Sequence, residues 1–319
     1  MKTRKAILGY GLIPLAILYF GQVAHCQSAD SLGLRRMADS TASTNSAAAM
    51  RQVDSTGPSV RPHRYHVNKI SGSIIIGIGL GTDAFAISRI KDKPDISTAE
   101  LQALNPDHVN SFDRWALHQN PSGYKNYSKL SDIIEPPLFI LFPAMLGLDK
   151  KIPKKDWLDI LFMYIEGHTI TFTFYNYSWL GPTAHDRFRP LTYYMQLPLA
   201  ARQDGGNRNS FYSGHTASVA FTSFFVAKVF CDYHPDLGFG KYLVYTAAAI
   251  PPVVMGYFRV RSLAHFPSDA LVGLGLGAMV GIVVPAIHKT KDRGISVNLF
   301  SAPDATGVNV CWTIPDHRS

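Results

Sequence analysis

The segment Arg259-Val-Arg-Ser-Leu-Ala-His265-Phe-Pro-Ser-Asp269 lies between two long apolar runs and places a guanidinium, an imidazole and a carboxylate at their junction. An imidazole can attack phosphorus as a nucleophile, and a guanidinium can hold phosphoryl oxygens with paired N–H donors. Pro267 is a favourable first residue of a helix, so we expect Asp269 in the first turn. There its carboxylate would orient the imidazole of His265 and stabilise its cation. The segment therefore predicts phosphoryl chemistry at a junction of two helices.

Two upstream segments add the other groups that such chemistry needs. Arg189-Pro190 offers a second guanidinium, which binds two oxygens as a lysine cannot. Ser213-Gly214-His215 opens an apolar helix, whose free N–H groups would face an oxyanion while Gly214 allows close approach. His215 is the candidate proton donor to the leaving oxygen. The ordinary alternatives are a solvated loop arginine at Arg189 and a simple helix N-cap at Ser213.

Five apolar runs predict an all-α helical bundle, and the last two are nearly free of charge. A helix that spans a bilayer needs about 20 apolar residues, so we expect a transmembrane bundle. Glu166 and His168 interrupt one run and would have to face the bundle interior. The alternative is a soluble bundle in which all five helices are buried. The runs cover residues 136–148, 157–180, 211–230, 241–258 and 268–287.

The ends of the chain differ from its middle. Residues 1–26 combine a basic start, an apolar stretch and small residues before Cys26, as an export signal does; an acylated Cys26 and an uncleaved anchor are the alternatives. Residues 27–68 are rich in Ser, Ala, Thr and Arg and predict a disordered linker. We expect the helical domain at residues 69–293, with its motif core at 130–290, and a small β-hairpin with a tail at 294–319.

Two segments of the helical domain are harder to assign. Residues 73–90 are rich in Gly and β-branched residues and predict a weak helix. Residues 91–130 are polar and predict an ordered surface region. Whether residues 73–90 and 136–148 cross a membrane is left open, because the first soon meets charges and the second is short and flanked by proline.

The charge of the chain bounds its partners. The formal net charge of +8 predicts an anionic partner. Basic residues are scattered in loops without an aromatic-basic stripe, which disfavours nucleic acid and favours a membrane surface or a phosphorylated substrate. No metal-ligand spacing occurs, so neither a metal nor another cofactor is expected. Oligomeric state leaves no trace in the sequence.

Clustered lysines predict an orientation. Lysines between residues 150 and 155 lie between two apolar runs, and Lys289, Lys291 and Arg293 follow the last one. Both clusters would be cytoplasmic by the positive-inside rule. Counting spans from there brings segments 181–210 and 259–267, which carry motif residues, to the opposite face.

In order and inner spacing, the three segments resemble the signature of the type-2 phosphatidic acid phosphatase and vanadium haloperoxidase superfamily, over roughly residues 130–290. The resemblance implies a helical bundle, a phosphohistidine intermediate on His265 and hydrolysis without a metal. It also implies that His215 is the acid and that Asp269 orients His265. Phosphate would be bound by Arg189, Arg259, Ser213 and Gly214.

The chain departs from that family at three positions. The family usually has a lysine seven residues before its first arginine, where this chain has Pro182. Arg187 or His185 are candidate replacements for that cation. Tyr212 stands where a proline usually precedes Ser-Gly-His, and Phe258 where a serine usually precedes the arginine.

The sequence thus predicts a bacterial inner-membrane phosphatase with its site facing the periplasm. The expected substrates are phosphate monoesters or diphosphates of lipids, such as phosphatidic acid, a polyprenyl diphosphate or a lipid A phosphate. One alternative is a soluble periplasmic acid phosphatase of the same superfamily. A vanadate-dependent haloperoxidase fits less well, because long uncharged runs are not expected of a soluble fold. A non-catalytic phospholipid-binding relative is the third.

Overall fold

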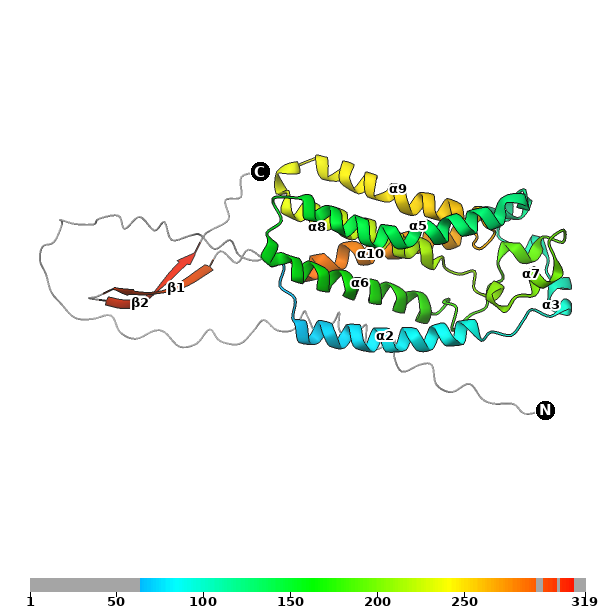
Figure 1. Ribbon diagram of the computed structural model, residues 1–319, viewed down its shortest axis with the longest axis horizontal. Helices are drawn as coiled ribbons and strands as arrows, with labels where there is room; N and C mark the ends of the chain where they lie inside the picture. Colours follow the sequence, from blue (N-terminus) through cyan, green and yellow to red (C-terminus); the bar gives the residue numbers. More distant parts are fainter. Residues whose placement is uncertain (1–63, 291–294, 303–304, 313–319) are drawn as a thin grey trace, which may run out of the picture. The chain divides into compact units, whose positions relative to one another are not determined.

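The computed structural model describes residues 64–290 with their side chains and the backbone of residues 295–302 and 305–312. Long helices dominate the described part of the chain (Figure 1). They are α2 (Lys69–Lys91), α5 (Tyr124–Met145), α6 (Trp157–Tyr177), α8 (Gly214–Tyr233), α9 (Gly240–Arg261) and α10 (Pro267–His288). Short helices α3 (Thr98–Gln102), α4 (Ser111–Arg114) and α7 (Leu199–Gln203) lie in the connections, with 3₁₀ turns such as Pro190–Tyr193 and Gly205–Arg208. The predicted helical bundle is confirmed.

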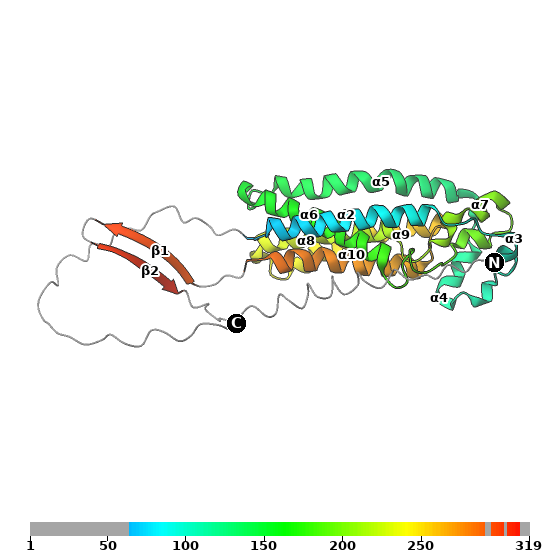
Figure 2. The same ribbon diagram turned by 90° about the horizontal axis from the view of Figure 1, so that it is seen from below.

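Helix α8 is the centre of the bundle. It packs against α5, α6, α9 and α10, and α2 packs on the outer side of α6. Figures 1 and 2 show the long helices side by side with their axes roughly aligned. The aromatic core between α6 and α8 includes Tyr164, Phe221 and Phe225, all buried. Because α8 touches four neighbours, its first turn is held rigidly at one end of the bundle.

Glycines on one face of α10 set its distance from α8. Gly273, Gly277 and Gly281 are four residues apart and therefore share a face. A Cβ atom on Gly277 would lie 2.1 Å from the backbone oxygen of Ala217, so no side chain fits there. Small residues allow helix backbones to approach closely in this way. The close approach aligns the first turns of α8 and α10, which carry His215 and Asp269.

Two helices are longer than the sequence predicted. The weak helix expected at residues 73–90 is the regular helix α2, because its glycines form the contact with α6: a Cβ on Gly79 would lie 2.1 Å from a Thr169 methyl group. The run at 136–148 belongs to α5, which begins twelve residues earlier at Tyr124 and continues through Pro136, Pro137 and Pro143. Tertiary packing overrides local propensity in both cases.

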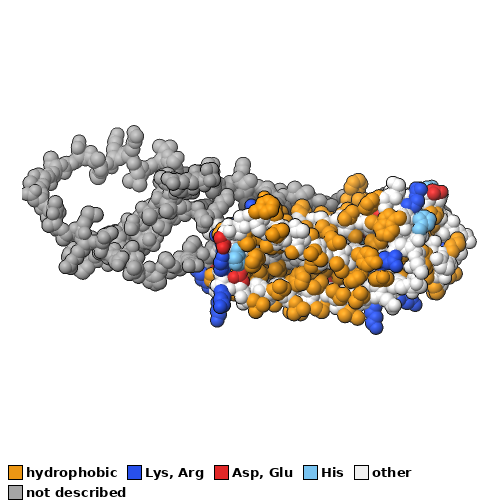
Figure 3. Space-filling view, turned by 90° about the horizontal axis from the view of Figure 1, so that it is seen from above, with side chains coloured by type: hydrophobic (Ala, Val, Ile, Leu, Met, Phe, Trp, Pro, Cys, Tyr) orange, Lys and Arg blue, Asp and Glu red, His pale blue; other side chains and the backbone are white. Residues whose placement is uncertain are grey.

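Four helical segments of the described chain are long and apolar enough to cross a membrane: Lys69–Lys91, Pro121–Leu148, Gly240–Arg261 and Pro267–His288. Figure 3 shows hydrophobic side chains covering the middle of one face of the bundle, with charged side chains gathered toward its ends. Exposed apolar residues of the long helices include Ile74 of α2, Ile140 of α5 and Val253 of α9. An apolar belt of this extent is typical of a protein that contacts lipid.

The motif segments lie at one end of the bundle, as span counting predicted. The backbone N–H of Leu191 donates to the carbonyl of Leu263, which joins the segment after Arg189 to the turn before His265. The lysines between residues 150 and 155 lie at the other end with Lys289, and there Lys151 pairs with Asp236. We refer to these as the site end and the lysine end.

The remaining predictions concern the chain ends. Strands β1 (Ile295–Ala302) and β2 (Ala305–Trp312) are paired antiparallel, with Ile295 opposite Trp312. Their side chains are outside the described residues, and the role of a C-terminal hairpin stays a prediction. The predicted signal at 1–26 and nearly all of the predicted linker, residues 27–63, are also outside the described residues.

Candidate active site

A tight turn after α9 places His265 next to Arg259. The helix ends in a Schellman motif, since Leu263 N–H donates to Val260 and Ala264 N–H donates to Arg259. Leu263 adopts the left-handed conformation that the motif requires, with φ of 57°, although most such positions hold glycine. Its side chain is fully buried, and this burial offsets the strain. The turn returns the chain to α9, and His265 N–H also bonds to the Arg259 carbonyl at 3.3 Å.

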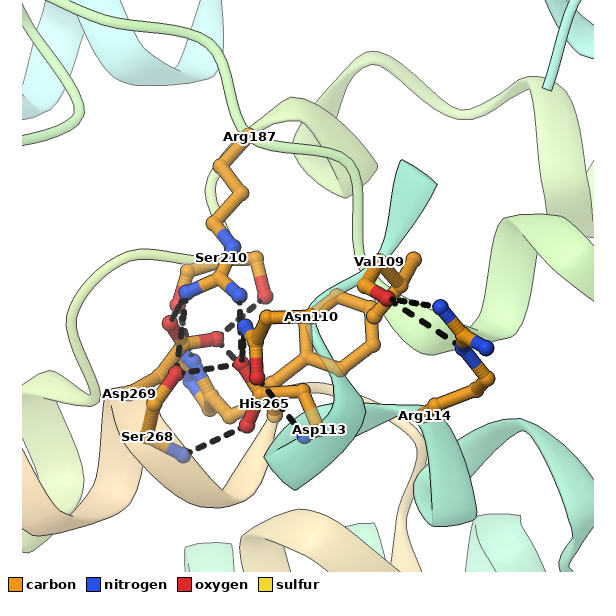
Figure 4. Close-up of polar contacts among 10 residues, drawn as sticks. Val109, Asn110, Asp113, Arg114, Arg187, Ser210, His265, Ser268 and Asp269 are labelled. Atoms are coloured by element: carbon orange, nitrogen blue, oxygen red, sulfur yellow. Dashed lines mark hydrogen bonds and ion pairs between the residues drawn. The ribbon is translucent and has the colours of Figure 1, made fainter. Parts of the chain in front are cut away.

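Asp269 lies in the first turn of α10 and has no exposed surface. Its carboxylate accepts hydrogen bonds from the Ser210 hydroxyl at 2.6 Å and the Phe266 N–H at 2.8 Å, and it pairs with Arg187. In the described structure, no hydrogen bond joins it to His265. The predicted direct contact is replaced by an indirect one through Ser210, whose backbone carbonyl bonds to the imidazole (Figure 4).

The contact to Ser210 fixes the tautomer of His265. Nδ1 lies 2.5 Å from the Ser210 carbonyl oxygen, which can only accept a hydrogen bond. Nδ1 therefore carries the proton, and Nε2 keeps its lone pair in the neutral ring. The sequence predicted a nucleophilic imidazole at this position. The tautomer leaves Nε2 free for that role.

Burial and two guanidinium groups keep His265 uncharged. The imidazole is 2% exposed. Burial lowers its pKa well below the usual value, and the positive charges of Arg259 and Arg189 lower it further. Arg189 and Arg259 line one cavity, and Asp132 links Arg259 to His215. That all four side chains act on one phosphate stays a prediction.

Arg187 is held by two buried carboxylates. Its guanidinium pairs with Asp269 and, at 2.8 Å, with Asp113 (Figure 4). It also lies 4.7 Å from the ring centre of Phe266. Both carboxylates are fully buried. Arg187 thus neutralises two buried charges and clamps the start of α10, and its alternative role in phosphate binding stays a prediction.

Asp113 is a site residue that sequence analysis missed. It comes from α4 in the polar region 91–130, which was predicted only as a surface. Its carboxylate accepts hydrogen bonds from the N–H and hydroxyl of Ser268, at 2.8 and 2.6 Å, besides pairing with Arg187. Burial would raise its pKa, but the bonds from Ser268, Asn110 and Arg187 outweigh burial and lower the pKa. An Asn-Ser-Phe-Asp sequence at residues 110–113 signals a helix start but does not indicate this long-range partner.

A cavity of about 440 Å³ opens at the site end. Arg189 and Arg259 line it, together with Asn207, Ser262, Leu263 and residues of α5. The Nη1 atom of Arg259 donates to the Ser131 hydroxyl at 3.0 Å, and the Nε atoms of both arginines are buried without a partner within residues 64–290. Unpartnered guanidinium donors beside a cavity of this size are suited to an oxyanion.

Two carboxylates of α5 contact the catalytic candidates. Nε2 of His215 lies 3.2 Å from both the Asp132 and the Glu135 carboxylates. Asp132 also pairs with Arg259 at 3.4 Å and lines the cavity. His215 and His265 are not among the residues that line it. A phosphate that enters from the cavity must therefore compete with Asp132 for the arginine and for His215.

Asparagine at position 132 should make this competition measurable. Removing the negative charge in Asp132→Asn should tighten inhibition by inorganic phosphate about fivefold, because Arg259 loses a competing anion that is itself half exposed. Inhibition constants measured on purified protein test this. Asp236→Asn, which removes an exposed carboxylate at the lysine end, is the control. Unchanged or weaker phosphate inhibition in Asp132→Asn would contradict the competition.

The other predicted residues have more ordinary surroundings. The Ser213 hydroxyl is buried and caps α8 by accepting from the Thr216 N–H, and its phosphate contact stays a prediction. Gly214 faces the Tyr175 ring, which lies 3.4 Å from where a Cβ would be. His185 is exposed and does not line the cavity. Pro182, where the family usually has a lysine, is buried.

Comparison with known proteins places this site in a family. Residues 160–293 match the PAP2 superfamily. That range contains all three motif segments. The crystal structure of a transmembrane PAP2 type phosphatidylglycerolphosphate phosphatase from Bacillus subtilis is similar at 20% identity, over 67% of this chain and 94% of that chain, with a TM-score of 0.38. No curated protein matches the chain.

Within the described residues, no group of three or more His, Cys, Asp or Glu is arranged to hold a metal ion.

Proposed function

We propose that the protein is a membrane phosphatase that hydrolyses phosphate monoesters or diphosphates of lipids through a phosphohistidine on His265. The observation that carries this proposal is the cavity lined by Arg189 and Arg259, with Asp132 linking Arg259 to His215, beside the buried His265 whose Nδ1 faces the Ser210 carbonyl. The match of residues 160–293 to the PAP2 superfamily supports the reaction class, and the apolar belt supports a lipid substrate.

The proposal gives each group a role. Nε2 of His265 attacks phosphorus, a P–N bond forms and the bond from phosphorus to the leaving oxygen breaks. His215 gives its proton to that oxygen. A water molecule then attacks phosphorus and returns a proton to His215 as the P–N bond breaks. Arg189 and Arg259 hold the phosphoryl oxygens throughout, and Ser210 and Asp269 keep the nucleophile oriented.

The direct test is phosphate release from lipid phosphates in the presence of EDTA. Phosphatidic acid, a polyprenyl diphosphate and a lipid A phosphate cover the proposed substrate class. The proposal expects turnover of at least one of them by the full-length protein without added metal. Loss of activity in EDTA that a divalent metal restores would contradict the proposed mechanism.

The pKa of His265 predicts how stability depends on pH. In the unfolded chain the imidazole takes up a proton below about pH 6.5, while in the folded protein it stays neutral to much lower pH. Because the unfolded state then binds more protons, this residue lowers the free energy of unfolding as pH falls below 6.5. Thermal unfolding at pH 7.5 and 5.5 should show a smaller acid-induced decrease in His265→Gln than in the unsubstituted protein. Equal decreases would contradict the shift.

The proposed orientation puts the lysine end in the cytoplasm and the site in the periplasm of a bacterial inner membrane. His66 N–H bonds to the His288 carbonyl, so α2 starts and α10 ends at the lysine end. The residues before α2 would then be cytoplasmic, which does not fit a cleaved export signal at residues 1–26. In intact cells, a membrane-impermeant thiol reagent should label Gln203→Cys at the site end and not Lys154→Cys. The reverse pattern would favour the cleaved signal and a cytoplasmic site.

A further inference from the structure

The outer wall of the cavity carries cations that the proposed reaction does not use. Lys125 and Lys129 of α5 line the same cavity as Arg189 and Arg259. Both lysines are exposed, and neither ammonium group forms an ion pair with any side chain of the described chain. Two cationic groups beside a phosphate site, without an anion of the protein to balance them, are suited to an anionic part of a ligand.

The order of the groups along α5 runs from the site outward. Asp132 contacts Arg259 and His215, and so marks the inner end of the cavity. Lys129 lies three residues before Asp132 and Lys125 lies seven residues before it. At about 1.5 Å per residue, these spacings are about 4.5 Å and about 10.5 Å along the helix. The two lysines share a helix face, since they are four residues apart. They therefore continue the cationic wall by one helical turn each, away from the reacting phosphate.

The charge of the wall exceeds what one phosphate needs. Four cationic side chains against the carboxylate of Asp132 leave a formal charge of +3 around the cavity. A phosphate monoester carries about −1.5 to −2 at neutral pH, and a diphosphate carries about one negative charge more. A lipid diphosphate that places its terminal phosphate between the two arginines would have its second phosphate, the one attached to the lipid, beside the lysines.

We propose that Lys125 and Lys129 form a binding site for the second phosphate of a diphosphate substrate. The inference rests on the proposed phosphatase function and narrows its substrate class. Lys125 and Lys129 hold the bridging oxygen and the phosphate that is attached to the lipid. This phosphate leaves with the lipid after the terminal phosphoryl group is transferred to His265. Both lysines lie in the first turns of α5, and the apolar tail of such a substrate can run along the apolar residues that follow on this helix.

The test compares a lipid monophosphate with the diphosphate of the same prenyl chain. In Lys125→Gln/Lys129→Gln, kcat/KM for the diphosphate should fall about tenfold or more, because charge-assisted hydrogen bonds are lost. For the monophosphate it should change less than about threefold. Lys154→Gln, an exposed lysine at the opposite end of the bundle, is the matched control and should change neither. An equal loss on both substrates, or no loss on either, would overturn the proposal.

A binding measurement separates failure of this inference from failure of the proposed function. Calorimetric titration of the full-length protein should show inorganic pyrophosphate binding at least about tenfold more tightly than inorganic phosphate, with the preference lost in the double variant. This outcome supports the second site even if no lipid phosphate is hydrolysed, in which case the proposed function alone fails. Equal affinities in the unsubstituted protein, or a preference that survives in the double variant, overturn the second site.

Discussion

Replacing His265 with alanine should lower phosphate release by about 10⁴-fold or more, because the P–N bond can no longer form. The residue follows Arg259 in a tight turn, and its contact to the Ser210 carbonyl leaves Nε2 unprotonated in the neutral ring. The measurement is phosphate release in EDTA from the best lipid substrate, under single-turnover conditions. The unsubstituted protein should also accumulate a labile phosphoryl group that is stable in alkali and lost in acid, as expected of a phosphorylated imidazole.

The matched control for this prediction is His185→Ala. His185 is exposed and does not line the cavity, so its replacement by alanine should leave the rate of phosphate release unchanged. The same variant tests whether this histidine replaces the cation missing at Pro182. Comparable rates for His265→Ala and the unsubstituted protein would end the assignment of the nucleophile. A large loss in His185→Ala would mean that the cation is supplied from there.

Replacing Arg187 with methionine should destabilise the protein by about 3–5 kcal/mol, because two buried carboxylates lose their shared partner. Asp113 and Asp269 have no exposed surface, and the guanidinium bridges them. The expected result is a large decrease in the thermal midpoint, measured in detergent. It should exceed the effect of Arg114→Met, whose ion pair with Asp107 is exposed.

A double-mutant cycle distinguishes this clamp from simple loss of packing. Asp113→Asn removes one of the two charges that Arg187 balances, so the double variant should be less destabilised than the sum of the single variants. Strict additivity would show that the two side chains do not interact. The cycle also tests whether region 91–130 contributes to the site, because Asp113 is its link to Arg187 and Ser268.

The local arrangement of the candidate residues could be predicted from the sequence, but the residues that support them could not. His265, Arg259 and Asp269 are placed by local rules: an apolar helix ends, a turn follows, and Pro267 starts the next helix. Such rules act within about ten residues, so the spacing alone indicates the arrangement. The roles of Asp113 and Ser210 depend on contacts between segments 59 to 155 residues apart, for which one sequence carries no signal.

Helix α5 shows the same limit. Its first half is polar, and its apolar run appeared too short because local hydropathy was the only guide. Packing against α8 and α9 extends the helix to Tyr124, and the added turns bring Asp132, Glu135 and the two lysines to the site. The glycines of α2 were misleading for a related reason: what lowers helix propensity in isolation allows close packing against α6.

The left-handed turn at Leu263 has a consequence for how this protein can vary. Arg259, the proposed phosphate ligand, and His265, the proposed nucleophile, are the two ends of one closed loop of backbone hydrogen bonds, so neither can move without the other. Insertions or deletions between them would shift the reacting nitrogen relative to its target by a whole residue. Evolutionary or designed changes in substrate choice should therefore accumulate across the cavity, on the facing helix, and leave this seven-residue stretch at constant length.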